Sequence, residues 1–528
     1  MGTRGLSEPT TLAMARLEKG SEDINPWDLA HETRKNSKDL TIKFTEPDVI
    51  HINQTDNQTQ LKKELSKSIG RKRDRPGDYN DDWSHPTLKK EIWHLGPDYS
   101  QLKASRDAVM NLAGKVRIAH FDTGILQGHP MLPDRILNSL QRSFSHDDDN
   151  SNDASDRGNN VINGIGHGTS TLSLLAGRKA NYPDYTFNDY LGGAPHAEII
   201  PVRIARSVVL LATSAFVEAI DYILGLSDAN KCDVITMSMG GLPTRAWANA
   251  VNRAYDQGIF ISCASGDNAG GLPTSNTVYP ARFRRVVNVT GVCYDYTPYY
   301  HGNIFHTTGV QGNFGPEFLM DNAIAAFSPN VSWIVHDKND NVLNNKIGLS
   351  GAGTSSSTPQ VAAAAANYIK KYRTELQALQ PWQRVEAIRN ALFHSAYKRN
   401  VNGDNMKLYF GNGVLKANDA LAIGVKDYPL VKQPEDEVRF PLFKMLFGRS
   451  FKGNHEDEIF NQMIEVEMLQ IAESSAVLQK MLNTVNYNFT LLSEAEKNNF
   501  LDEVLRQSSA SNTLKKYLSS NRKLITKT

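Results

Sequence analysis

Two short segments in the middle of the chain hold an acid and an imidazole in settings that favour catalysis. Asp122 ends the apolar run at 116–121 and is followed by small turn residues. This pattern places Asp122 at the carboxyl end of a buried strand, where open α/β sheets hold their active sites. His167 lies between glycines, which let substrate and backbone approach its ring closely. Each has a structural alternative, since an acid after a strand and a histidine at a helix N-terminus are both common.

A third segment, residues 351–359 (GAGTSSSTP), brings hydroxyl groups to the start of an expected helix. Free N–H groups and the positive dipole end of a helix stabilise negative charge that develops during attack on a carbonyl. The structural alternative is an N-cap with a proline in the first turn. Acid, histidine and serine therefore follow one another in an order known for hydrolytic triads. The spacing alone does not choose among the three consecutive serines.

Strands and helices that alternate along the chain would position these residues. The expected strands are 116–121, 198–204, 234–239, 259–263 and 286–292. The expected helices between and after them are 170–175, 215–226, 244–256, 357–372 and 382–396. This alternation predicts an α/β fold, with a mostly parallel sheet and helices on both faces. We expect a catalytic domain over residues 93–426.

The two ends of the chain differ from its central part in composition and residue pattern. Residues 1–92 are polar and form an N-terminal segment, a possible pro- or regulatory region, with a helix near 26–32, strands at 40–44 and 49–52, a helix at 61–69 and a charged linker at 70–86. Residues 427–528 carry apolar residues at helical spacing within 459–482, 493–507 and 512–518, and Ser493 with Glu496 predicts a capping box. We expect this helical region either to dock a protein partner and be removable, or to be a lid packed permanently on the catalytic domain.

The three segments together resemble the subtilisin-like serine protease (subtilase) family over about residues 93–425. Residues 122–124 (DTG) are similar to the family's aspartate motif, 167–169 (HGT) to its histidine motif, and 353–359 (GTSSSTP) to its serine motif. The last match selects Ser355 as the nucleophile. The resemblance implies a subtilisin-like fold and a serine endopeptidase that acts on protein or peptide substrates. His167 would remove the proton of Ser355, Asp122 would orient the ring, and an acyl-enzyme would form on Ser355.

Further matches assign the substrate cleft. Residues 233–241 (DVITMSMGG) resemble the family's substrate-pairing strand, so Ser238, Met239 and Gly240 are expected to bind the substrate backbone as an added strand. The opposite wall of the cleft is expected from three further residues, Ala264, Ser265 and Gly266.

The oxyanion position departs from the family. Where most members have asparagine, this chain reads Asp267 followed by Asn268. An ionised carboxylate cannot donate to an oxyanion, so Asp267 would serve only when protonated, and Asn268 would serve if the alignment shifts by one. The departure also keeps a second hypothesis open, namely a catalytically weak subtilase-fold binding or regulatory module whose helical tail docks a protein partner.

Composition excludes several classes. The chain has 528 residues, 40% of them hydrophobic, and 58 basic against 57 acidic residues, which gives no electrostatic case for a nucleic-acid partner or a membrane surface. The longest apolar stretch, 208–217, is too short to span a membrane, and we see no signal peptide. The cysteines, Cys232, Cys263 and Cys293, form no CxxC pair, so we expect a reducing, cytoplasmic compartment and no zinc site.

No cofactor is implied by the motifs. The acidic stretch 146–156 (HDDDNSNDASD) has two interpretations, a Ca²⁺-binding loop or a solvated surface loop. It does not fit the EF-hand template, because Asn152 stands where that template requires glycine.

Overall fold

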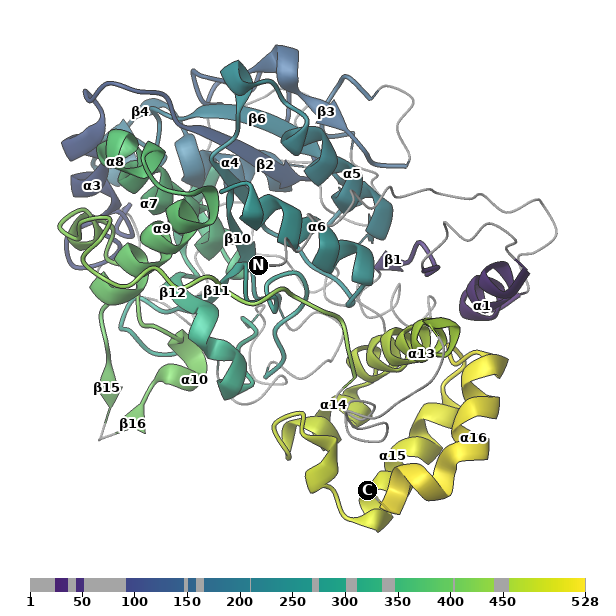
Figure 1. The fold of residues 1–528 in the computed structure, drawn as a ribbon. Coiled ribbons are helices and arrows are strands. Elements are labelled where there is room, and N and C mark those ends of the chain that lie inside the picture. The colour runs from purple at the N-terminus through teal and green to yellow at the C-terminus, as the bar shows by residue number, and fades with distance from the viewer. Residues whose placement is uncertain are drawn as a thin grey trace, which may run out of the picture.

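The computed structural model describes residues 24–36, 44–51, 92–146, 151–157, 166–208, 210–267, 275–300, 311–334, 347–401, 404–440 and 455–527. The expected helix at 61–69, the linker at 70–86 and most of the expected strand at 40–44 lie outside these residues. Figure 1 shows a large α/β body with a smaller group of helices beside it.

A parallel sheet forms the centre of the α/β body. In the described residues its strand order is β12-β11-β10-β9-β2-β6-β3, and every neighbouring pair is parallel. The strands are β2 (Arg117–Asp122), β3 (Arg142–Ser143), β6 (Glu198–Arg203), β9 (Val234–Met237), β10 (Phe260–Ala264), β11 (Val287–Val292) and β12 (Ala323–Phe327). Five of them lie within a few residues of the predicted strands, so the predicted α/β fold with a mostly parallel sheet is confirmed.

Helices cover both faces of this sheet. The helices α5 (Thr213–Leu224) and α6 (Arg245–Asp256) lie on one face, and α3 (Leu102–Val109), α4 (His167–Ala176), α7 (Thr354–Lys371) and α9 (Pro381–Ser395) belong to the other (Figure 1). Side chains alternate between the two faces along each strand. On β2, for example, Ile118 packs in the core beneath α7, while Ala119 and Phe121 pack toward α5 and α6.

Shorter elements complete the body. They are β4 (Lys179–Tyr182) paired with β5 (Phe187–Tyr190), β7 (Ala205–Ser207) with β8 (Leu210–Ala212), β13 (Val331–Ile334) with β14 (Ile347–Gly351), β15 (Asn400–Val401) with β16 (Asp404–Asn405), and the helices α8 (Arg373–Gln377), α10 (Lys407–Phe410) and α11 (Ala417–Ala420).

The N-terminal segment crosses from the helical group to the α/β body. Its helix α1 (Pro26–Asn36) contacts the C-terminal helices, and its strand β1 (Ile50–His51) pairs antiparallel with β8. Between them, Glu46 accepts hydrogen bonds from the N–H groups of Arg245 and Ala246 at 3.0 and 2.8 Å, at the start of α6. Asp48 does the same for Ser214 at the start of α5, at 3.0 Å. Both carboxylates satisfy donors that a helix leaves free in its first turn.

The C-terminal region is helical, as predicted. Its helices are α13 (His455–Ser474), α14 (Ala476–Asn483), α15 (Glu494–Arg506) and α16 (Asn512–Lys527). The predicted helical stretch 459–482 is interrupted at Ser475, whose extended backbone ends α13 and whose hydroxyl caps α14 by accepting from the Leu478 N–H. The capping box of Ser493 and Glu496 is present.

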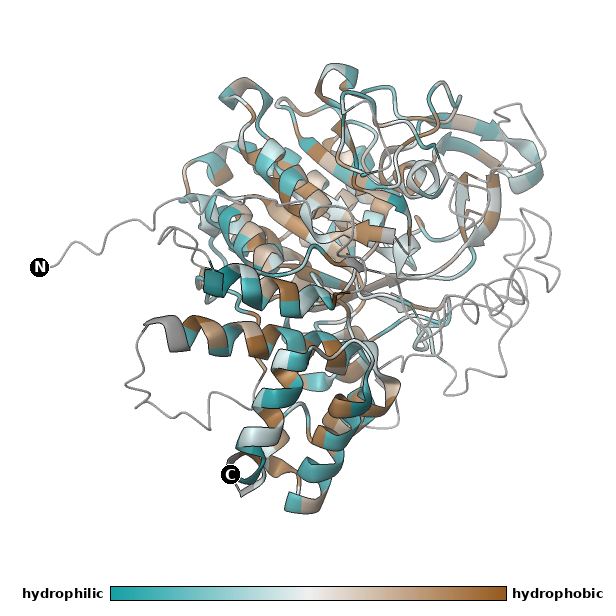
Figure 2. Cartoon of the chain, turned by 90° about the vertical axis from the view of Figure 1, so that its right-hand side faces the viewer, coloured by the Kyte–Doolittle hydropathy of each residue, from teal (hydrophilic) through white to brown (hydrophobic). Residues whose placement is uncertain are grey.

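Most apolar residues of these helices are buried. Figure 2 shows that hydrophobic and hydrophilic residues occur together on each helix of the C-terminal group. Most apolar residues of α13 are buried together with residues of α5, α6 and the central sheet in one continuous cluster, although Phe460 is exposed. The face that a docking tail would need is therefore largely occupied within the chain itself. The structure favours the packed helical region over the free docking tail.

Candidate active site

Asp122 and His167 come together at the carboxyl end of β2. The Nδ1 atom of His167 lies 2.7 Å from Oδ1 of Asp122. Gly168 permits this approach, because a Cβ atom added there would lie 2.0 Å from the carbonyl oxygen of Gly124 in the turn after β2. The predicted acid and imidazole therefore form a hydrogen-bonded pair.

Their environment sets the charge on each member of the pair. Asp122 is fully buried; burial favours its neutral form, but the adjacent His167 and several hydrogen bonds hold its pKa below its ordinary value. Burial lowers the pKa of His167, and this is outweighed by the charge and hydrogen bond of Asp122, with smaller contributions from Asp156 and Asp267, so the pKa is raised. The pair thus consists of an ionised carboxylate and an imidazole that binds a proton readily.

The second oxygen of Asp122 has a polar partner that the motifs did not reveal. The hydroxyl of Thr171 donates to Asp122 Oδ2 at 3.0 Å, and Nε2 of His120 lies 2.9 Å from the same hydroxyl oxygen. Thr171 has one proton, and its best acceptor is the charged carboxylate. Nε2 of His120 must then be the donor, so His120, Thr171 and Asp122 form a directed chain of hydrogen bonds. Burial lowers the pKa of His120 to about 4, which keeps its ring neutral near pH 7.

Sequence spacing could have found these two residues. His120 and Asp122 are two residues apart on one strand, and His167 and Thr171 are four residues apart on one helix, so each pair shares a face. Asp156 is a further missed residue, because its Oδ2 accepts from the Gly166 N–H at 2.8 Å and from the Thr123 hydroxyl at 3.1 Å. It ties the turn after β2 to the start of α4.

Ser355 lies in the first turn of α7. Its hydroxyl donates to the carbonyl oxygen of Ser238 at 3.0 Å, and the Ser238 hydroxyl donates to the carbonyl oxygen of Ser355 at 3.1 Å. The neighbouring hydroxyls point elsewhere: Ser356 bonds to the Gly353 carbonyl, and Ser357 to that of Ala326, and both residues are fully buried. Of the three serines only Ser355 is partly exposed, and helices α4 and α7, which begin at His167 and Thr354, pack against each other.

Both predicted walls of the cleft lie beside the start of α7. Ser238, Met239 and Gly240 follow β9, and Ser238 is bonded to Ser355 as described. Ala264 ends β10, and Ser265 and Gly266 follow it. Thr354 fastens this second wall, since its hydroxyl donates to the Gly266 carbonyl at 3.0 Å.

Asp267 lies at the N-terminus of α7. Its Oδ1 accepts from the Thr354 N–H at 2.9 Å, and its Oδ2 would lie 2.6 Å from a Cβ atom added to Gly353. Burial raises the pKa of Asp267 to about 6, although the Thr354 hydrogen bonds and His167 oppose the rise. A group with this pKa holds a proton in a usable fraction of molecules in mildly acidic solution. The alternative oxyanion residue, Asn268, lies outside the described residues.

Other sequence expectations bear on metals and membranes. Within the described ranges, no group of three or more metal-binding side chains is placed to hold an ion. Part of the acidic stretch, residues 147–150, lies outside them. In that same described part of the chain, none of the helices combines the length and apolar character required to cross a bilayer. The three cysteines are buried and free.

The parallel sheet and the hydrogen-bonded Asp122–His167 pair at the carboxyl end of β2 are typical of a class of α/β hydrolytic enzymes. Comparison with known proteins places the chain within that class. A model of the subtilase family matches residues 113–413, which is more than half of the chain. The chain belongs to the subtilase family, and it is a subtilisin-like serine endopeptidase.

Individual relatives are distant. Subtilisin DY from Bacillus licheniformis is 28% identical over 323 residues, which cover 60% of this chain and 96% of that protein. Subtilisin E from Bacillus subtilis is 27% identical over 303 residues, covering 56% and 67%. The minor extracellular protease Epr from Bacillus subtilis is 28% identical over 202 residues, covering 38% of this chain and 26% of Epr. None of these three matches extends over the whole of this chain.

Proposed function

We propose that this protease cleaves peptide bonds through a triad of Asp122, His167 and Ser355. The observation that carries the proposal is the 2.7 Å contact between Asp122 Oδ1 and His167 Nδ1. It fixes the ring so that Nε2 remains free to accept the Ser355 proton. Asp122 stays ionised because its surroundings lower its pKa, and it stabilises the imidazolium that forms.

The reaction proceeds in two halves. Ser355 Oγ attacks the substrate carbonyl carbon while its proton passes to His167, and the imidazolium then gives this proton to the leaving amine as the peptide bond breaks. Water, deprotonated by His167, releases the acyl group from Ser355. The Ser355 N–H in the first turn of α7 supplies one donor for the oxyanion.

The substrate is a protein or peptide segment in extended conformation. We propose that it lies between residues 238–240 and 264–266, pairing with their backbone as an added strand. The Ser238 carbonyl oxygen is 3.0 Å from the nucleophile, which supports a substrate path directly past Ser355.

A second candidate function is favoured by Asp267. A carboxylate at the start of α7 repels a developing oxyanion unless it is protonated, so the chain could bind peptides with little turnover. Covalent labelling separates the two functions, because an acyl-transfer enzyme reacts with a fluorophosphonate at its nucleophile, whereas a binding module without an activated serine does not.

The test uses the full chain and three variants. Ser355→Ala should abolish both labelling and peptide hydrolysis. Ser356→Ala and Ser357→Ala should keep both, because their hydroxyls bond to backbone carbonyls away from the cleft. Undiminished labelling of Ser355→Ala, measured by intact-protein mass spectrometry, would show that another residue is the nucleophile.

A further inference from the structure

Residues 275–283 connect the two walls of the proposed substrate cleft. The Val278 N–H donates to the Ser265 carbonyl at 3.0 Å, on one wall. On the other wall, Tyr279 and Gly241 exchange two backbone hydrogen bonds of 2.8 and 3.1 Å. The fit is tight, because a Cβ atom added to Gly240 would lie 2.4 Å from Val278 Cγ2. The position of this segment therefore sets the spacing and register of the two walls.

A single carboxylate from the C-terminal region holds this segment from behind. Glu473, in the last turn of α13, accepts from the Asn276 side-chain amide at 2.7 Å and from the Arg282 guanidinium at 2.5 Å. The side chains of Glu473 and Arg282 are only 5% and 6% exposed. Glu473 thus binds both ends of residues 276–282.

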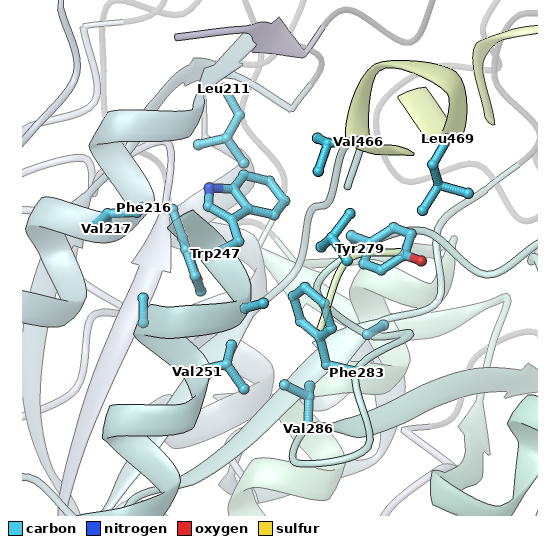
Figure 3. Packing of buried hydrophobic residues seen from close by; sticks show 14 of the residues in the cluster. Leu211, Phe216, Val217, Trp247, Val251, Tyr279, Phe283, Val286, Val466 and Leu469 are labelled. Carbon is cyan, nitrogen blue, oxygen red and sulfur yellow. The ribbon is translucent and has the colours of Figure 1, made fainter. Parts of the chain in front are cut away.

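Neighbouring contacts reinforce the same connection. Tyr487, after α14, donates its hydroxyl proton to the Asn276 side-chain oxygen at 2.9 Å, and its ring centroid lies 4.1 Å from the Arg282 guanidinium. Figure 3 shows Tyr279 and Phe283 lying toward Val466 and Leu469 of α13. The C-terminal helices therefore pack against residues 275–283, behind the proposed substrate cleft.

We propose that Glu473 is a positioning residue for the substrate, through which the C-terminal helical region sets the enzyme's affinity for extended peptides. The proposal rests on the proposed function of the cleft. A buried charge that loses its partner is poorly tolerated, so removing the charge of Glu473 leaves Arg282 uncompensated and frees residues 275–283 to move. The two walls then no longer match the hydrogen-bond spacing of a substrate strand. Glu473 does not contact the triad, so the chemical step is unaffected.

The experiment compares Glu473→Gln with a matched control in the full chain. The control is Glu467→Gln, on the same helix. Glu467 is buried like Glu473, but it accepts from the Ser511 N–H and hydroxyl at 2.7 and 2.9 Å and so holds the start of α16. Three quantities are measured: kcat and KM for a pool of internally quenched octapeptides, the labelling rate with a small fluorophosphonate, and amide hydrogen exchange of residues 275–283.

We expect KM for Glu473→Gln to rise about tenfold with kcat and labelling rate little changed, since misplacing a binding wall removes ground-state and transition-state binding alike. Amide exchange should accelerate in residues 275–283. Glu467→Gln should leave KM and this exchange as in the unmodified protein. Unchanged KM and exchange in Glu473→Gln, or equal changes in both variants, would overturn the proposal.

The two proposals fail in different ways. If the unmodified chain neither reacts with the fluorophosphonate nor cleaves the peptides, the proposed function is wrong. Hydrogen exchange still tests whether Glu473 positions residues 275–283. Faster exchange confined to residues 275–283 in Glu473→Gln would then support its positioning role, and unchanged exchange would refute it.

Discussion

At the scale of single residues, the oxyanion position and the general base place opposite demands on pH. In the proposed mechanism His167 must be neutral to accept a proton, whereas Asp267, if it rather than Asn268 serves the oxyanion, donates only when it is protonated. The pKa of Asp267 is about 6, and that of His167 is raised above its ordinary value of 6.5. When His167 and Asp267 together hold one proton, it lies mainly on His167, which has the higher pKa. The state that catalysis needs, with neutral His167 and protonated Asp267, is therefore the less populated of the two.

This predicts a bell-shaped dependence of kcat/KM on pH in the unmodified enzyme. Activity falls on the acid side as both groups become protonated, and on the alkaline side as the shared proton is lost. Asp267→Asn donates at every pH, so its activity should be higher near neutrality and should lack the alkaline fall. Measuring kcat/KM over a full pH series for both proteins checks this. If the activity of Asp267→Asn still falls at alkaline pH, that fall is due to another group. Besides Asp267, the charged groups that raise the pKa of His167 are Asp122 and Asp156, and the charged group that acts on Asp267 is His167 itself.

The hydrogen-bond chain from His120 through Thr171 to Asp122 gives a second prediction. Thr171→Val keeps the shape but removes the donor to Asp122 Oδ2, which leaves a buried charge with one partner fewer. Removing a hydrogen bond to a charged group costs about 1.5–3 kcal/mol, which corresponds to roughly a ten- to hundredfold loss in kcat if Asp122 then holds His167 less firmly. Thr171→Ser should restore most of the rate. Steady-state kinetics measures this loss. An unchanged kcat in Thr171→Val would show that the hydrogen bonds from His120 to Asp122 are only structural.

At the scale of elements, helix starts recur as the points where distant segments join. Ser355 and His167 both lie in first turns, and α5, α6 and α16 each receive a carboxylate from the N-terminal segment. Asp28, for instance, accepts from the N–H groups of Asn512 and Thr513 at 2.9 Å each. Because four N–H groups at each helix start lack intrahelical partners, acidic residues far away in sequence can bind there.

The contact of Glu46 with the start of α6 is sensitive to pH. Burial raises its pKa from 4.5 to about 7, so the folded protein holds the proton more tightly than the unfolded chain. The contribution of Glu46 to the free energy of unfolding therefore falls as pH rises from about 4.5 to 7. Glu46→Gln keeps an acceptor oxygen and does not titrate, so its Tm relative to the unmodified protein should increase by a few degrees across that range.

Calorimetry over a pH series measures this difference. The exposed Glu32→Gln on α1 is the control and should show no such trend. A constant difference in Tm between Glu46→Gln and the unmodified protein would show that Glu46 does not titrate in this range.

At the scale of the whole molecule, the C-terminal region completes the core. Asp436 accepts from the N–H groups of Arg284 and Arg285 at 2.7 and 3.0 Å, and α13 buries its apolar residues against the α/β body. Figure 3 shows how closely Trp247 of α6, Tyr279 and the residues of α13 lie. The region therefore packs as part of one continuous core with the α/β body.

We expect a chain that ends at Asp427 to be insoluble or peptide-inactive, because truncation exposes this apolar cluster to water. Co-expression of residues 428–528 as a separate chain should restore part of the soluble protein. Size-exclusion chromatography and peptide hydrolysis check both. A soluble, monomeric and fully active truncated chain would show that the C-terminal region is a separable tail, the other interpretation of its sequence.

The sequence by itself determined the central fold and supplied the residues of the proposed triad. Local patterns sufficed for this, because strands with apolar residues on both faces and glycine-flanked motifs are encoded by neighbouring residues. The alternation of strands and helices predicted the parallel sheet. The choice of Ser355 among three consecutive serines came from the resemblance to the subtilase serine motif, and the structure shows Ser356 and Ser357 bonded to the backbone.

Only the tertiary structure decided how the ends of the chain are used. The contact of Glu473 with Arg282 joins residues 191 positions apart, and that of Asp28 with Thr513 joins residues 485 apart. No periodicity within a helix records such pairings, because they depend on which surfaces meet after folding. For the same reason the apolar face of α13 could be recognised in the sequence, whereas the surface that it packs against in the α/β body could not.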